Sequence, residues 1–188
     1  MCPKLPQPYT PPVGVYVALL RGINVGGKGK LAMSDLRDIC ERTGFDCAKT
    51  YIQSGNVAFK SSLPERQVKA KLEKALTTRM GRPAVALVRT PAELRAAIRR
   101  NPFKEAAPRQ LLVLFLDEAP PKNALDRLRI PGREKVELAG RELFIHYPDG
   151  MGHSKLAHPL FDIGTGRNLN TVEKLATMAE ELAISSER

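Results

Sequence analysis

Apolar residues along the chain follow strand-like spacing in some stretches and helix-like spacing in others. Short apolar runs with β-branched residues, bounded by glycine, proline and polar clusters, are typical of buried strands. They predict strands at residues 13–20, 47–53, 56–60, 84–89, 110–117, 134–138 and 142–147. Apolar stripes at helical spacing predict helices that begin near residues 33, 64, 91, 121 and 170, with a short helical segment before the last one.

Cap and turn residues support several of these boundaries. Ser62 to Glu65 and Thr90 to Glu93 both match the capping box, in which a hydroxyl side chain and a glutamate satisfy the first N–H groups of a helix. Asn170, with Glu173 three residues later, predicts the cap of the last helix. Ser54-Gly55 indicates a tight turn, so the strands on either side of it form a hairpin.

The order of these elements predicts the fold class. Residues 13–90 follow the order β-α-β-β-α-β of a ferredoxin-like unit, and residues 91–188 repeat β-α-β-β-α in outline and end in a C-terminal helix. No polar linker separates the two halves. We therefore predict an α+β fold in which two ferredoxin-like (βαββαβ-type) subdomains pack together. The proline-rich residues 1–12 are expected to form a flexible N-terminal lead without the features of a secretory signal.

Composition limits the class of protein. Apolar residues make up 43% of the 188-residue chain and charged residues 27%, which is typical of globular proteins. No apolar run approaches the roughly 18 residues that a membrane helix requires, so no membrane partner is expected. The three cysteines match neither a disulfide framework nor a metal-binding spacing. We therefore expect a cytoplasmic protein, in which Cys40 lies in the core.

Positive charge is concentrated in the middle of the chain. The net charge is +10, and residues 60–109 alone carry 13 basic and 4 acidic side chains. A local basic surface can bind phosphate-rich partners such as nucleic acid, but it can equally be a solvated helix face. The candidate polar motifs lie mostly outside this stretch, so charge and ligand site can be separate features.

The glycine-rich loop after the first strand resembles a nucleotide-binding motif only in part. Gly22 to Lys28 satisfies G-x-x-x-x-G-K, but Gly29 stands where a hydroxyl should hold magnesium. The next helix begins only near Met33, and a hairpin follows instead of a parallel strand. A P-loop is therefore disfavoured. The loop still combines backbone N–H groups, which glycine leaves accessible, with basic side chains that suit an anion.

Several polar segments resemble a known family. The segments RGINVGGKGKLAM, TYIQSGNVAF, VRTPAEL, NPF, LFL, YPDGMGHSKL and TGRNLNTVEKL occur in this order, over roughly residues 15–180. Together they resemble the bacterial DUF1697 family, a domain of unknown function. The resemblance implies an α+β protein of two ferredoxin-like subdomains, and it implies no established activity.

These polar segments supply the candidate ligand-binding residues. We expect three of them to converge on one groove between the halves, where arginine and lysine would bind an anion and amides would bind a base or sugar. The candidates are Arg21, Asn24, Lys28, Lys30, Gln53, Ser54, Asn56, Ser154, Lys155, Arg167, Asn168 and Asn170. Helix capping at Asn170 and turn chemistry at Ser54 to Asn56 are the alternative explanations.

The sequence favours a cytoplasmic protein that binds a phosphorylated or anionic ligand, either a nucleotide or a nucleic acid. The alternatives are an enzyme that acts on a phosphorylated small molecule in the same groove, and a protein-interaction module. No metal site is expected, because His146, His153 and His158 have no matching acidic cluster. Catalysis, the cofactor and the oligomeric state stay open.

Overall fold

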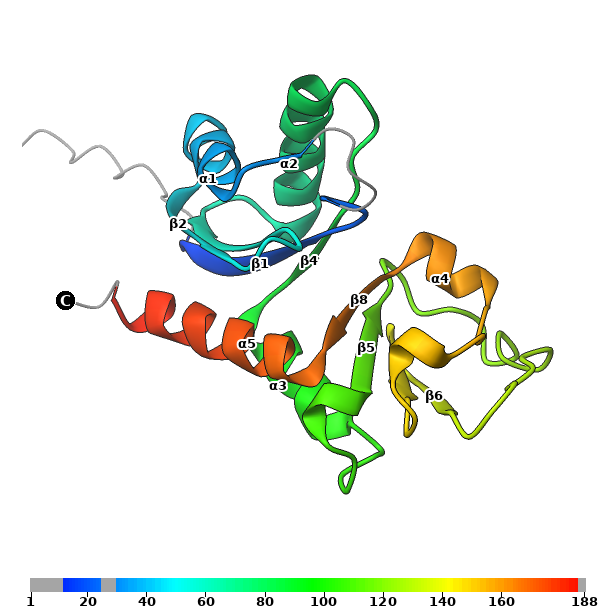
Figure 1. Ribbon diagram of the computed structural model, residues 1–188. Coiled ribbons are helices and arrows are strands. Elements are labelled where there is room, and N and C mark those ends of the chain that lie inside the picture. Colours follow the sequence, from blue (N-terminus) through cyan, green and yellow to red (C-terminus); the bar gives the residue numbers. More distant parts are fainter. Residues whose placement is uncertain (1–11, 25–29, 186–188) are drawn as a thin grey trace, which may run out of the picture.

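The computed structural model describes residues 12–24 and 30–185, and its architecture is α+β (Figure 1). The predicted N-terminal lead, apart from Pro12, lies outside these residues. The described chain contains five α-helices and two four-stranded antiparallel sheets. None of its helices is long and apolar enough to cross a membrane.

The first sheet is built from the amino-terminal half of the chain. Its strands lie in the order β2-β3-β1-β4, and α1 and α2 cover one face. The elements are β1 (Gly14–Leu20), α1 (Met33–Arg42), β2 (Asp46–Tyr51), β3 (Asn56–Ser61), α2 (Glu65–Met80) and β4 (Ala86–Arg89). Alternation along β1 explains the two-sided burial: Ala18 and Leu20 face the helices, and Val17 and Leu19 face the opposite way.

The second sheet has the same strand order as the first. The order β6-β7-β5-β8 corresponds strand by strand to β2-β3-β1-β4. Its elements are α3 (Pro91–Arg100), η1 (Pro108–Gln110), β5 (Leu111–Phe115), β6 (Lys135–Ala139), β7 (Glu142–His146), η2 (Met151–His153), α4 (Pro159–Ile163), β8 (Thr165–Asn168) and α5 (Leu169–Ile184). The last strand of each sheet is followed directly by a helix: α3 follows β4, and α5 follows β8.

These two helices fill the space between the sheets. Apolar residues of α3 and α5 pack with the inward-facing residues of both sheets in one core, which includes Val17, Phe115, Phe144 and Leu175. Figure 1 shows α5 crossing beneath the first sheet, on the face opposite α1 and α2. The two halves therefore share a core, and the inner faces of both sheets are covered.

The outer faces of the two sheets are covered differently. Two helices pack on the first sheet, with Leu36, Leu72 and Leu76 fully buried. The second sheet is covered by the short helix α4, which contributes Leu160, and by irregular segments that contribute Leu125 and Leu156. Three exposed apolar side chains, Ile130, Met151 and Ile163, lie in or beside these segments.

The helix predicted near residues 121–129 is wrong. This segment forms successive turns, with hydrogen bonds from the N–H of Ala124 to the carbonyl of Pro121 (2.9 Å) and from the N–H of Leu128 to that of Leu125 (2.9 Å). Leu125 and Leu128 are only half-buried. A nine-residue segment with such limited burial gains too little from packing to offset helix nucleation.

Two of the three predicted caps are also wrong. Helix α2 begins at Glu65 with Pro64 as its N-cap, so Ser62 lies too far from the helix to form a capping box. Helix α5 begins at Leu169, and Asn168 caps it by accepting a hydrogen bond from the N–H of Thr171 (2.9 Å). The capping box of Thr90 and Glu93 is confirmed, with both of its hydrogen bonds present.

Candidate functional site

A cavity lies beside the first loop, where β1 leads into α1. Its volume is about 730 Å³, and we call it the first-loop cavity. It is lined by Asn24, Lys30, Leu31, Ala32, Met33, Ser34, Arg37 and Gln53. Three of the predicted site residues therefore line one cavity, together with Arg37, which the motifs did not indicate. Lys28, a fourth candidate from the same loop, lies outside the described residues.

Asn24 joins the two ends of the first loop. Its side-chain oxygen accepts a hydrogen bond from the N–H of Leu31 (2.8 Å), and its amide group donates to the carbonyl of Leu31 (3.0 Å). The same amide donates to the carbonyl of Gln53 in the β2–β3 hairpin (2.8 Å). Asn24 has a positive φ of 61°, a conformation that asparagine tolerates better than most residues. It therefore fixes the wall of the cavity through its side chain.

The amino terminus of α1 opens onto this cavity. Ala32 is its N-cap, and within the described residues no side chain caps it. The first N–H groups of an uncapped helix carry partial positive charge and lack partners inside the helix. Lys30 and Arg37 are both exposed beside them, and Arg37 also donates to the hydroxyl of Thr50 (3.1 Å). The local charge is thus positive, although Asp35 in the first turn pairs with Arg79 (2.6 Å).

Arg167 reaches from the second half to the end of β1 and to the β2–β3 hairpin. Its side chain makes six hydrogen bonds, which engage all five N–H groups of the guanidinium. The acceptors are the side chains of Asn56 (2.5 Å) and Thr165 (2.8 Å) and the carbonyls of Leu20 (2.8 Å), Ser54 (2.9 Å), Gly55 (3.4 Å) and Gly166 (2.8 Å). Arg167 is 7% exposed, and this burial lowers its pKa to about 10.

The hairpin residues meet Arg167 from the other side. Asn56 is fully buried and donates to the carbonyl of Tyr51 (2.9 Å) and to the hydroxyl of Ser54 (3.0 Å). Gln53 at the tip is exposed. The structure therefore brings the first loop, the first hairpin and Arg167 together, and their polar groups are largely bonded to one another.

The remaining candidates do not line the first-loop cavity. Arg21 donates to the carbonyl of Asp162 at the end of α4. Asn168 caps α5, and Asn170 is exposed in its first turn.

Ser154 and Lys155 line a second cavity of about 300 Å³, with residues 131–134 and 147–150 among its other walls. There the Ser154 hydroxyl donates a hydrogen bond to the carboxylate of Glu134. This hydrogen bond lowers the pKa of Glu134, and the backbone N–H groups of Glu134 and Gly132 act in the same direction. Neither Arg21 nor Arg167 lines this cavity.

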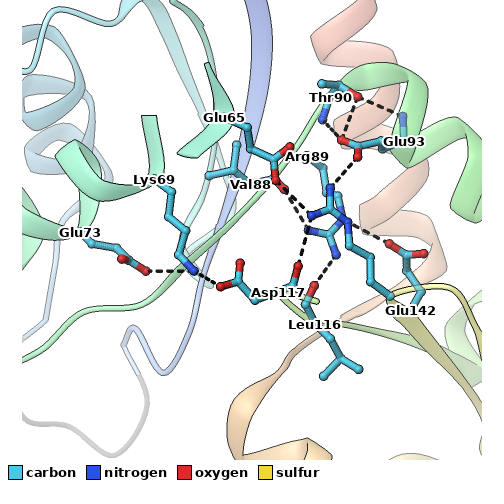
Figure 2. A network of polar contacts seen from close by, with 11 residues as sticks. Glu65, Lys69, Glu73, Val88, Arg89, Thr90, Glu93, Leu116, Asp117 and Glu142 are labelled. Carbon is cyan, nitrogen blue, oxygen red and sulfur yellow. Dashed lines mark hydrogen bonds and ion pairs between the residues drawn. The ribbon is translucent and has the colours of Figure 1, made fainter. Parts of the chain in front are cut away.

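A second buried arginine mirrors Arg167 in the opposite half, and sequence reasoning missed it. Arg89, at the end of β4, donates to the carbonyl of Leu116 (2.6 Å) and to Glu142 (3.2 Å), the first residue of β7 (Figure 2). Arg167 likewise bonds the end of β1 and Asn56, the first residue of β3. Each arginine also donates to the carbonyl of the preceding residue. Two sequence signals were present: Arg89 ends a buried apolar run, and it lies in the segment VRTPAEL, from which no site residue was chosen.

The Arg89 region carries more charge than the Arg167 region. Arg89 is fully buried, with its guanidinium 5.4 Å from the ring centre of Phe115, and Glu142 also pairs with Arg100 (2.7 Å). Burial and then the nearby charge of Arg141 lower the pKa of Arg89. Arg141 itself pairs with Glu65 (3.1 Å) and Glu93. These contacts tie α2 and α3 to the second sheet.

Other chemistry-bearing residues show no such clustering. No group of three or more His, Cys, Asp or Glu side chains in the described chain could hold a metal ion. Cys40 is fully buried, as expected, and burial raises its pKa to about 12. A thiol with this pKa is protonated at neutral pH and is a poor nucleophile.

The comparisons with known proteins place the chain in a family. A family model for proteins of unknown function, DUF1697, matches residues 13–144. No curated protein matches the chain. The structure is similar to that of the conserved bacterial protein SP0830 from Streptococcus pneumoniae, with a TM-score of 0.75 and 25% identity, over 89% of this chain and 99% of that one. Because the family model matches more than half of its residues, the protein belongs to the DUF1697 family.

Proposed function

We propose that the protein binds a small phosphorylated or otherwise anionic ligand in the first-loop cavity. The carrying observation is that exposed Lys30 and Arg37 stand beside the uncapped amino terminus of α1, at the rim of a cavity of about 730 Å³. Helix N–H groups and basic side chains together favour an anion. Asn24 and Gln53 line the same cavity, and their amides suit the polar edge of a base or a sugar.

A small ligand fits the fold better than single-stranded nucleic acid. Helices α3 and α5 cover the inner faces of both sheets, so no stacking platform is open there. The basic stretch supplies an exposed face on α2 that includes Lys71 and Lys74, and this face is separate from the cavity lining. Nucleic acid binding on α2 is therefore the alternative outcome of the test.

The enzymatic alternative receives less support from the geometry. Such an enzyme would need the basic candidates of all three polar segments in one groove, whereas Lys155 lines a cavity that contains neither Arg21 nor Arg167. The guanidinium of Arg167 is occupied by protein acceptors. The alternative of a protein-interaction module is supported only by single exposed apolar side chains, of which Ile130, Met151 and Ile163 lie in or beside the outer layer of the second sheet.

Titration calorimetry with inorganic pyrophosphate, ATP and a single-stranded RNA tests the proposal at about 50 and 200 mM salt. We expect pyrophosphate or ATP to bind with a shallow salt dependence. The double variant Lys30→Ala/Arg37→Ala should lose at least about tenfold in affinity, because each hydrogen bond to a charged group contributes about 1.5–3 kcal/mol. Lys28→Ala should weaken binding as well.

The matched control removes two exposed lysines from α2, Lys71→Ala/Lys74→Ala, and should leave the affinity unchanged. Absence of binding by all three probes at low salt would overturn the proposal. RNA binding with a steep salt slope, lost in the α2 control and kept in the Lys30/Arg37 variant, would replace it with nucleic acid recognition on α2.

Two further proposals concern the fold of the two halves and the location of the protein in the cell. We propose that the two halves, residues 13–90 and 91–188, are ferredoxin-like subdomains, and the shared strand orders β2-β3-β1-β4 and β6-β7-β5-β8 support this. Within the described residues, the second half lacks a helix between β5 and β6 and has only the short η2 and α4 between β7 and β8. We also propose that the protein acts in the cytoplasm.

A further inference from the structure

Arg167 belongs to the second half, but its side chain bonds the two segments that flank the first-loop cavity. One segment is the end of β1, where the carbonyl of Leu20 accepts a hydrogen bond just before the first loop begins. The other is the β2–β3 hairpin, where Ser54 and Asn56 accept hydrogen bonds. Gln53, the neighbour of Ser54, lines the cavity and accepts the hydrogen bond from Asn24.

We infer that Arg167 is a positioning residue for the first-loop cavity: it fixes the β2–β3 hairpin against the end of β1 and makes no contact with the ligand itself. This inference rests on the proposed function. It also gives a physical reason why the segments QSGN and TGRN occur in one chain, since the arginine of the second binds the backbone of the first.

The geometry requires a guanidinium group. Its six acceptors surround a planar group and lie on β8, on the end of β1 and on the hairpin. A lysine ammonium has three donors at a single point and cannot reach all of these acceptors together. Replacement by lysine should therefore release part of the hairpin even though the positive charge is kept.

Arg89 provides a matched control within the same molecule. Like Arg167, it is buried in the last strand of its sheet, and it bonds a carbonyl at the end of another strand, here that of Leu116, the residue directly after β5. Its partners Glu142 and Leu116 belong to the second sheet and its ends, and the first-loop cavity has no lining residue in common with them. Loss of Arg89 should disturb the fold without moving the β2–β3 hairpin.

The experiment compares the full-length variants Arg167→Lys and Arg89→Lys. Hydrogen exchange at residues 51–56 reports the hairpin, and titration with inorganic pyrophosphate and ATP reports the cavity. We expect Arg167→Lys to speed exchange at 51–56 and to weaken binding about tenfold or more. Arg89→Lys should leave both values within about twofold of the wild type at a temperature where both variants are fully folded.

Chemical rescue adds a readout that a general loss of stability would not give. In Arg167→Ala, guanidinium at low millimolar concentration should restore part of the affinity, and ammonium should not; if this variant does not fold, Arg167→Lys decides. Wild-type binding with an unchanged affinity in Arg167→Lys would overturn the inference and leave the proposed function standing. Absence of wild-type binding would overturn the proposed function and, with it, the inference.

Discussion

The two halves of the molecule share a sheet order and a buried arginine, but they differ in what covers the outer face of the sheet. In the first half two long helices bury a continuous apolar surface. In the second half the same face is covered by turns, by α4 and by the loop around residues 151–158. By contrast, the inner faces of both sheets pack against α3 and α5 in one shared core. The comparison indicates that the core between the sheets defines the fold, while the outer layers are free to vary.

The arginines themselves extend this comparison. Arg89 is paired with a carboxylate, Glu142, whereas the corresponding partner of Arg167 is the neutral side chain of Asn56. Arg167 has carbonyl oxygens as its main acceptors, so its charge is balanced by dipoles alone among the bonds described. The buried arginine is thus stabilised by a carboxylate in one half and by neutral hydrogen-bond acceptors in the other.

The largest expected effect comes from removing the two partners. Glu142→Ala should lower the free energy of unfolding by about 3–5 kcal/mol, because it leaves the buried charge of Arg89 uncompensated. Asn56→Ala should cost about 1–3 kcal/mol, because Arg167 keeps its carbonyl acceptors. Urea unfolding followed by far-ultraviolet circular dichroism measures both, since the chain has no tryptophan. Equal losses would show that the countercharge is not what distinguishes the two arginines.

The second prediction concerns the outer layers. Leu72→Ala in α2 should lower the free energy of unfolding by about 3–5 kcal/mol, within the range for buried leucines, because Leu72 is fully buried. Leu160→Ala in α4 should cost about 2 kcal/mol or less, because this side chain remains 8% exposed and a loose layer can close around it. The same unfolding experiment compares them. A larger loss at Leu160 would mean that the irregular layer is as tightly packed as the helical one.

The caps of α3 and α5 give a smaller effect. Thr90→Ala removes a capping box and should cost about 1–2 kcal/mol, whereas Asn168→Ala removes one hydrogen bond and should cost about 1 kcal/mol. Thermal unfolding measures both. A double variant should show additive losses, because the two caps have no bonded partner in common. Strong coupling between them would show that α3 and α5 form their amino termini as one unit.

Local signals in the sequence predicted local structure well. The capping box of Thr90 needs only four consecutive residues, and the strand at 111–115 needs only a short apolar run. The box at Ser62 was wrong because the helix begins at Glu65, which instead pairs with Arg141 of the second half. The partner of the Glu65 carboxylate is Arg141, which lies 76 positions away in the sequence, so a local pattern could not predict it.

The candidate site was harder to predict for the same reason. Asn24 and Gln53 could be assigned to one site because each lies in a polar turn, and the structure places them in contact. The partners of Arg167 could not be predicted, because the carbonyl of Leu20 lies 147 positions away and main-chain acceptors leave no trace in the side-chain pattern. Arg89 was missed because an arginine at a strand end is more often exposed.

The smallest predicted effect is a pH dependence at the amino-terminal cap of α3, which the Asn168 cap of α5 does not share because asparagine does not titrate. Burial alone would raise the pKa of Glu93, but hydrogen bonds from Thr90 and the charge of Arg141 outweigh it and lower the pKa. A lowered pKa in the folded state means that the ionised carboxylate stabilises the fold above its ordinary pKa of about 4.3. This stabilisation should be lost as the pH falls through the folded-state value.

The measurement is the free energy of unfolding of the wild type and of Glu93→Gln between about pH 6 and pH 3. The variant should be less stable at pH 6, by about 1 kcal/mol or less because the side chain is partly exposed, and the difference should shrink as the pH falls. Asn168→Ala is the control, because asparagine does not titrate and its loss should be the same at every pH. A Glu93→Gln penalty that stays constant down to pH 3 would show that Glu93 acts only through its hydrogen bonds to Thr90, which glutamine can partly replace, and that the charge of Arg141 contributes nothing at this helix end.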